Sequence, residues 1–209
     1  KKGADVTVYT TNIDSHFNLN VAINQEIIID GVKVFYFPVS FLRSWFYSYK
    51  FHQALSENIK KFDIINIIGV FHAGSLLGAY YAKKFNKPYI ISPRGSLMIE
   101  TLKKKGFKKR IYLSLIEKGN LKNAAAIHFT TELEKDEYLS QGLPLRQAIV
   151  IPNGLDIEEF QSHEFTAHRN FRSRFRIGDD KKIILFLSRL NWKKGLDTLI
   201  PAFAEVVKK

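Results

Sequence analysis

Two short segments carry the residue types that bind phosphate groups and sugar hydroxyls. In the first, Arg94 and Gly95 follow an apolar run, and Ser96 precedes a predicted helix. An arginine offers five donors to an anion or a hydroxyl, and a glycine lets a ligand approach the backbone closely. We expect Ser96 to cap the following helix while nearby amides stay available to an oxyanion. A plain turn with a solvated arginine is the alternative interpretation.

The second segment has a similar layout. Arg189 ends an apolar run, and Lys194 and Gly195 precede another predicted helix. An arginine can hold phosphate oxygens through two parallel hydrogen bonds, and Lys194 adds a point charge. The amides that follow Gly195 lie at the positive end of the helix dipole. This combination is typical of a pyrophosphate site.

A basic run lies between these two segments. It holds six cations without an acidic residue among them: Lys103, Lys104, Lys105, Lys108, Lys109 and Arg110. Such a run favours an anionic membrane surface or a nucleic acid as the partner. The aromatic residues that single-strand binding needs are limited here to Phe107 and Tyr112, which weakens the nucleic-acid hypothesis. A solvated helix face is the third explanation.

The composition excludes several other kinds of site. The 209 residues include no cysteine, which rules out disulfides, a thiol nucleophile and any cysteine-ligated metal. The P-loop, Gly-x-Gly-x-x-Gly, His-Glu-x-x-His and Gly-x-Ser-x-Gly patterns are absent. His163 and His168 have no acidic cluster at ligand spacing, so we interpret them as solvated and expect no metal site.

Charge and composition also bear on the location of the protein. The formal net charge is +12, and 45% of the residues are hydrophobic, as in globular proteins with an ample core. The lack of cysteine fits a reducing compartment, and the first residues lack the apolar core of a signal peptide. We therefore expect a cytoplasmic protein that can contact the inner face of a membrane.

One segment is long enough to span a bilayer, because residues 64–82 contain no charge. The segment also contains Asn66 and His72, and it divides into a β-branched half and a half that is compatible with a helix. We expect a buried strand, a loop and a helix here, and a transmembrane helix is the alternative.

Strands and helices are predicted to alternate along the chain. Apolar runs predict strands at 6–10, 32–37, 64–68, 89–92, 126–130, 149–151 and 183–187. Helical spacing predicts helices around 47–59, 75–85, 108–117, 133–142 and 196–207. Thr131 and Glu134 have the spacing of a capping box, in which each side chain caps a backbone amide at a helix start. The alternation predicts an α/β fold with a Rossmann-like, mostly parallel sheet and helices on both faces.

A change in composition predicts the domain organisation. Residues 1–155 form the first domain, and residues 156–180 are a polar linker. Residues 181–209 provide the first strand and helix of a second domain. One strand and one helix cannot bury their own apolar faces, so we expect this second domain to be incomplete in this chain.

In combination, these segments resemble the family 4 retaining glycosyltransferases, which have the two-domain GT-B fold. The resemblance rests on the order and spacing of several stretches: 88–97 (PYIISPRGSL), 126–134 (AIHFTTELE), 151–156 (IPNGLD), 186–190 (FLSRL), 194–197 (KGLD) and Ala202 with Phe203. It implies transfer of a sugar from a nucleotide-diphosphate donor to an acceptor hydroxyl with retention at the anomeric carbon. It implies no obligatory metal and no other cofactor.

The resemblance also assigns roles to residues. Arg189 and Lys194 match the pair that binds the donor diphosphate, where the two cations neutralise the leaving group. Asn153, Gly154 and Asp156 match the crossover between the domains, near the cleft. Many relatives have a histidine at the position of Arg94, and these stretches imply that Arg94, Gly95 and Ser96 line the acceptor side of the cleft. His72 either faces the acceptor or is satisfied locally.

Two features of the family pattern are absent from this chain. The opening strand with its glycine-rich loop is missing, and the pair of glutamates that contacts the donor is expected beyond Lys209. We therefore expect the chain alone to be inactive. As a whole protein, we expect a transferase that acts on a saccharide or lipid-linked acceptor in cell-surface polysaccharide synthesis. The alternative is a non-catalytic basic α/β module that binds nucleic acid or an anionic surface.

Overall fold

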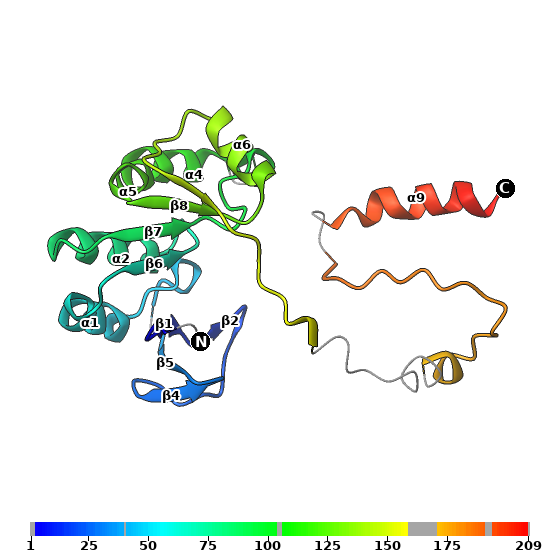
Figure 1. Cartoon of the computed structure of the whole chain (residues 1–209), viewed down its shortest axis with the longest axis horizontal. Helices are drawn as coiled ribbons and strands as arrows, with labels where there is room; N and C mark the ends of the chain where they lie inside the picture. Colours follow the sequence, from blue (N-terminus) through cyan, green and yellow to red (C-terminus); the bar gives the residue numbers. More distant parts are fainter. Residues whose placement is uncertain (1–2, 40, 104–105, 159–170, 191–193, 209) are drawn as a thin grey trace. The chain divides into compact units, whose positions relative to one another are not determined.

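The computed structural model describes residues 3–39, 41–103, 106–158, 171–190 and 194–208. The chain divides into two compact units, residues Lys1–Gly154 and Leu155–Lys209 (Figure 1). Four residues of interest, Lys104, Lys105, His163 and His168, lie outside the described residues.

The first unit begins with a small three-stranded sheet. β1 (Thr7–Thr11) runs parallel to β5 (Val32–Phe37), and β4 (Glu26–Ile29) pairs antiparallel with the other edge of β5. Asp30 and Gly31 make the tight turn between β4 and β5 with positive φ values of 48° and 70°. This Asp-Gly turn is a hairpin signal, although the apolar pattern alone predicted only β1 and β5.

The main sheet of the first unit is fully parallel. It has the strand order β6 (Ile65–Ile68), β7 (Tyr89–Ser92), β8 (Ala126–Phe129) and β9 (Ala148–Val150). Each of these strands overlaps a predicted one, which confirms a parallel α/β architecture. In the described part of the chain this sheet is separate from the three-stranded sheet, because β1 pairs there with β5 and not with β6.

Helices connect and flank the parallel strands (Figure 1). α1 (Tyr49–Asn58) precedes β6, α2 (Ala73–Lys84) follows it, and α6 (Glu132–Ser140) connects β8 to β9. Between β7 and β8 the chain forms α3 (Ile99–Lys103), α4 (Gly106–Tyr112), one π-helical turn η3 (Leu113–Glu117) and α5 (Lys118–Asn123). Short 3-10 helices are η1 (Arg43–Trp45) and η2 (Ile59–Lys61).

The uncharged segment 64–82 forms β6, a turn and most of α2. The strand–loop–helix prediction is therefore confirmed, and the transmembrane alternative is wrong. No helix among the described residues has the length and apolar character needed to cross a bilayer.

A single apolar core joins the three-stranded sheet and the four-stranded parallel sheet of the first unit. Phe37 at the end of β5 belongs to the same cluster as Ile67, Ile91, Ile127 and Phe129 of the parallel strands. The last three of these side chains have 0% exposure. Burial of each side chain of this size stabilises the fold by about 1.5–3 kcal/mol, so this core fixes the strand ends on which the polar side chains are mounted.

The second unit differs from its prediction. Residues 183–187 form no strand, and four of these five side chains are exposed. An isolated extended segment leaves its backbone amides and carbonyls without a ladder partner, which explains why the apolar pattern alone does not produce a strand. The predicted helix is confirmed as α9 (Leu196–Val207), and none of its residues is buried.

Candidate functional site

A row of polar groups crosses the parallel sheet near the carboxyl ends of its strands. Ser92 of β7 hydrogen-bonds to Nδ1 of His128 in β8 at 2.8 Å, and its hydroxyl lies 3.5 Å from Oδ1 of Asn66 in β6. His128 Nε2 donates to the carbonyl of Ile151, which follows β9, at 2.9 Å. The row therefore links all four strands at the edge where open α/β sheets bind ligands.

The contacts of His128 place a proton on Nε2, because the carbonyl of Ile151 can only accept. The Ser92 hydroxyl has a single proton, which it can donate to either Oδ1 of Asn66 or Nδ1 of His128. The arrangement has the spacing of a serine nucleophile and its base. Ser92 has 0% exposure, however, so its hydroxyl is not presented to a substrate and the pair stabilises the sheet edge.

The turn after β7 presents a cation at this edge. Arg94 and Gly95 have positive φ values of 53° and 72°, so two successive residues adopt the left-handed conformation. This conformation strains Arg94 and suits Gly95. The Arg94 side chain is exposed, and its Nη1 donates to Oδ1 of Asn153. The structure thus brings together two of the predicted site residues that are 59 positions apart in sequence.

A buried carboxylate holds this turn in place. Oε1 of Glu134 accepts from the amide of Gly95 at 2.6 Å, and Oε2 accepts from the amide and the hydroxyl of Thr130 at 2.9 Å each. The Thr131 hydroxyl caps the amide of Glu134 at 3.1 Å, as predicted. The reciprocal half of the capping box is wrong, because Glu134 binds the loops after β7 and β8 in place of the Thr131 amide.

The predicted role of Ser96 as a helix cap is also wrong. α3 begins at Ile99, three residues later, and the amide of Ser96 bonds to the carbonyl of Pro93 at 3.1 Å. Oε2 of Glu137 accepts from the amide of Ile99 at 3.0 Å. Two carboxylates of α6 therefore occupy backbone amides that we had expected to be open to an oxyanion, and the Arg94 side chain is what this turn presents.

His72 forms the N-cap of α2 and uses both ring nitrogens locally. Nδ1 accepts from the amide of Ser75 at 3.1 Å, and Nε2 lies 3.1 Å from the carbonyl of Ile68. Burial lowers the pKa of His72 below its ordinary value of 6.5, and the hydrogen bond to Ile68 and the charge of Glu117 oppose that shift. Of the two alternatives for His72, contact with the acceptor or local satisfaction, these contacts favour local satisfaction.

Glu117 supports the turn that carries His72. This glutamate has 0% exposure and accepts from the Phe71 amide and the Ser75 hydroxyl, both at 2.9 Å. Nδ2 of Asn120 provides a third donor at 3.3 Å. Three donors satisfy the buried carboxylate without a cation. Glu117 therefore links the π-helical turn η3 to the loop between β6 and α2, where Phe71 has a φ of 68°.

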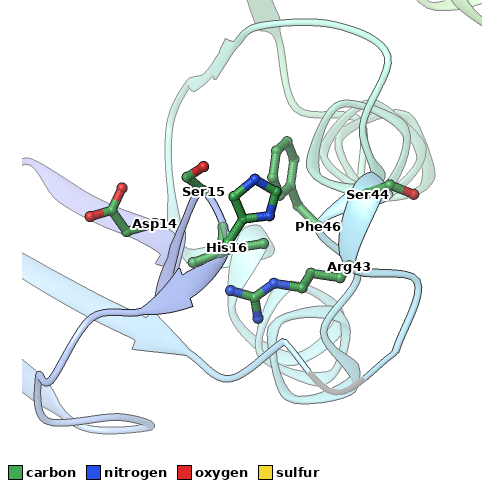
Figure 2. A pocket seen from close by; sticks show the side chains of 7 residues that line it. Asp14, Ser15, His16, Arg43, Ser44 and Phe46 are labelled. Atoms are coloured by element: carbon green, nitrogen blue, oxygen red, sulfur yellow. The ribbon is translucent and has the colours of Figure 1, made fainter.

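A pocket of about 550 Å³ lies between η1 and the turn of the hairpin formed by β2 (Ile13–Asp14) and β3 (Phe17–Asn18) (Figure 2). Its lining comes from this hairpin and from η1, and includes Ile13, Asp14, Ser15, His16, Arg43, Ser44 and Phe46. The Arg43 guanidinium bonds to Oδ1 of Asn18 and to the carbonyl of Phe17, so it holds the hairpin. The Phe46 ring lies 6.3 Å from the ring of His72, so the pocket adjoins the His72 turn.

The remaining predicted site residues lie at or beyond the end of the first unit. Gly154 is exposed, and a Cβ placed on it would meet nothing within 4 Å. Asp156 lies in the second unit, where its carboxylate accepts from the amide of Glu158 at 3.1 Å. Arg189 and Lys194 are also in the second unit and are both exposed. Gly195, at φ 64°, is the N-cap of α9.

The described basic residues of the 103–110 run have different environments. Lys103 is exposed and pairs with Glu100 one turn earlier in α3. Lys108 and Arg110 are exposed on α4. Lys109 is half-buried, and its Nζ donates to the carbonyl of Thr101 at 2.8 Å and lies 5.7 Å from the centroid of the Phe71 ring. Lys109 therefore points toward the protein, in contrast to our expectation of a surface cation.

Sequence reasoning missed Ser92, His128 and Glu134 as members of this edge. His128 alternates with the fully buried Ile127 and Phe129 in β8, so a polar residue at the end of an apolar strand was the available signal. The capping-box spacing assigns Glu134 to helix capping alone. No local pattern indicates that its carboxylate bridges to Gly95, which is 39 residues away.

Comparison with known proteins was consistent with this architecture. Residues 1–159 match the family described as Glycosyltransferase Family 4. The alpha-monoglucosyldiacylglycerol synthase of Streptococcus pneumoniae (strain ATCC BAA-255 / R6) is 26% identical over 151 residues, which cover 70% of this chain and 34% of that protein.

Two solved structures share the fold. The crystal structure of Anabaena Alr3699/HepE in complex with UDP and glucose matches with a TM-score of 0.61 at 16% identity. The match covers 84% of this chain and 45% of the Anabaena chain. The sucrose-phosphate synthase from Thermosynechococcus elongatus matches with a TM-score of 0.66 at 18% identity. The match covers 98% of this chain and 50% of the synthase chain. The chain thus spans half or less of the length of these relatives, and the likeness confirms the predicted α/β fold class.

Proposed function

The chain belongs to Glycosyltransferase Family 4, and from this premise we propose that it forms the acceptor side and part of the donor side of a retaining glycosyltransferase. The observation that carries the proposal is the polar edge of the parallel sheet, where Arg94 and Asn153 meet beside the row of Asn66, Ser92 and His128. The enzyme transfers a sugar from a nucleotide-diphosphate donor to an acceptor hydroxyl.

Arg189 and Lys194 bind the diphosphate of the donor. Cleavage of the bond between the sugar and the β-phosphate leaves negative charge on the nucleoside diphosphate, which fixed cations stabilise without a metal ion. Both side chains are exposed, and Lys194 directly precedes the Gly195 cap of α9. The Anabaena structure contains UDP and glucose, which supports a UDP-sugar as the first donor to test.

The acceptor is a saccharide or a lipid-linked molecule of a cell-surface polysaccharide pathway, handled at the cytoplasmic face of a membrane. The name of the Streptococcus pneumoniae relative describes a diacylglycerol glycolipid, which supports a lipid acceptor. On the acceptor side, Arg94 can donate to a hydroxyl or a phosphate oxygen, because its guanidinium is exposed and only one of its five donors is engaged by Asn153.

We expect the 209-residue chain alone to lack transferase activity. No described residue of the second unit is buried, so the Arg189 and Lys194 side chains have no core to hold them in a binding geometry. Turnover of a nucleotide sugar by the purified chain would contradict this expectation.

The test of the function uses the intact enzyme that contains this chain. It is incubated with UDP-, GDP- and ADP-sugars and with saccharide or diacylglycerol acceptors, and nucleoside diphosphate release is measured. NMR of the product reports whether the anomeric configuration is retained. Arg189→Ala and Lys194→Ala should each lower kcat/KM by about 100-fold or more, and the exposed Lys182→Ala serves as the control. An inverted product, or equal activity of all three variants, contradicts the proposal.

A further inference from the structure

A stripe of large apolar side chains lies on the outer surface of the helical run between β7 and β8. Phe107, Ile111 and Leu115 follow one another at four-residue spacing in α4 and η3. Their exposed fractions are 80%, 44% and 77%. Residues at this spacing share one face of an α-helix, so Phe107 and Ile111 lie on the same side of α4, and Leu115 extends this row into the π-helical turn.

The opposite face of the same run packs against the protein. Leu113 and Glu117 are buried, and Tyr112 contacts the Phe71 ring at a centroid distance of 5.9 Å. The orientation of the stripe is therefore fixed by the core and by the Glu117 hydrogen bonds. The outward position of the apolar side chains is a consequence of this packing.

Cations flank the apolar stripe. At 100° per residue, Lys108 and Arg110 lie on either side of the line through Phe107 and Ile111, and both are exposed. Lys118 and Lys122 of α5 are exposed as well. The one acidic residue between positions 101 and 131 is Glu117, which is buried. The exposed charges that α4, η3 and α5 themselves carry are thus all positive.

We propose that Phe107, Ile111 and Leu115 insert into the surface of an anionic lipid bilayer while Lys108 and Arg110 bind its headgroups. An in-plane helix with apolar side chains on one face and flanking cations gains both hydrophobic burial and attraction to anionic lipids. This inference deepens the proposed function, because it names the surface that brings the active site to a lipid-linked acceptor.

The same features argue against a nucleic acid and against a second copy of this chain as the partner of this face. A nucleic acid gains little from three exposed aliphatic and aromatic side chains, since only Phe107 among them can stack on a base. A second copy of this face would bring Lys108 and Arg110 against the same cations, which repel each other. A bilayer accommodates the apolar stripe and the charges at once.

The experiment measures binding of the 209-residue chain to vesicles, with no donor or acceptor present. Sedimentation with vesicles of 70% phosphatidylcholine and 30% phosphatidylglycerol is compared with sedimentation with pure phosphatidylcholine. We expect binding to the anionic vesicles alone, with the partition coefficient falling between low and high salt. The double variant Phe107→Ser/Leu115→Ser should lower the partition coefficient by about tenfold or more, and Lys108→Gln/Arg110→Gln by about tenfold or more.

Matched controls separate the face from general effects. Phe17→Ser removes a phenylalanine of similar exposure, 77%, on the hairpin, and Lys60→Gln/Lys61→Gln removes two exposed lysines next to α1. Both controls should bind vesicles like the parent chain, and circular dichroism checks that each variant is folded.

Three outcomes overturn the proposal. They are unchanged vesicle binding of the Phe107→Ser/Leu115→Ser variant, tighter binding of the parent chain to a DNA duplex than to vesicles, and a dimer of the parent chain that this variant abolishes. Because no sugar transfer is measured, failure here leaves the test of the transferase activity intact.

Discussion

The carboxylate of Glu134 accepts a hydrogen bond from the backbone amide of Gly95 at 2.6 Å, across 39 residues of sequence. Its other oxygen accepts two hydrogen bonds from Thr130. One side chain of α6 therefore holds the loops that follow β7 and β8. Because Gly95 is adjacent to Arg94, the position of the exposed guanidinium depends on a carboxylate that is itself buried.

We predict that Glu134→Gln destabilises the chain by about 1–3 kcal/mol. A glutamine offers one acceptor oxygen and turns its NH₂ group toward either Gly95 or Thr130, both of which donate. Urea unfolding gives the change in the free energy of unfolding, and the NMR shift of the Gly95 amide reports the lost bond. Glu132→Gln is the control, because Glu132 is exposed and pairs with Lys135. An unmoved Gly95 amide in Glu134→Gln would show that the bond does not hold the turn.

Gly69→Ala should disturb the His72 turn. Gly69 has a φ of 83°, and an added Cβ would lie 2.9 Å from Nε2 of His72. We expect a loss of about 1–3 kcal/mol in stability from backbone strain and displacement of the imidazole. Gly119→Ala is the matched control: nothing lies within 4 Å of its Cβ position in α5, so this variant should gain up to about 1 kcal/mol. Thermal unfolding of both variants tests the opposite signs.

The stability of the chain should fall at acidic pH partly through His72. Burial lowers the pKa of His72 in the folded chain below the ordinary value of 6.5, so His72 becomes protonated at a higher pH in the unfolded chain than in the folded chain. The free energy of unfolding therefore decreases as the pH falls below about 6.5 and is unaffected by this group above it. His72→Asn keeps an N-cap side chain and removes the titration. Urea unfolding between pH 5 and 8 should show a shallower decline in this variant than in the parent, and parallel curves would contradict the prediction.

Tyr89→Phe should lower stability by about 1 kcal/mol. The Tyr89 hydroxyl is buried and donates to the carbonyl of Asn120 in α5 at 2.7 Å. Burial also raises the pKa of Tyr89 to about 12, so the absorbance change of its ionisation should occur at a higher pH than that of exposed tyrosines. Tyr80→Phe, at a residue with 51% exposure, is the control. Equal unfolding midpoints for the two variants would refute the assignment.

The sequence alone determined where the parallel strands and most helices of the first unit lie along the chain, because apolar periodicity and turn residues act locally. It indicated the turn at Arg94 and Gly95, and the Thr131 cap of α6. The strand expected at 183–187 does not form in the structure. A strand requires a hydrogen-bonding neighbour, and no local apolar pattern supplies one.

The tertiary structure decided which side chains meet. The strand registers bring Ser92 next to His128, and the packing of α6 brings Glu134 to Gly95; the two pairs are 36 and 39 positions apart in sequence. Likewise, the basic run predicted a surface cation at every position, yet core packing turned Lys109 inward and left Phe107 exposed. Local propensity fixes the elements, whereas burial of the shared core fixes their relative orientation, and orientation decides which groups form the site.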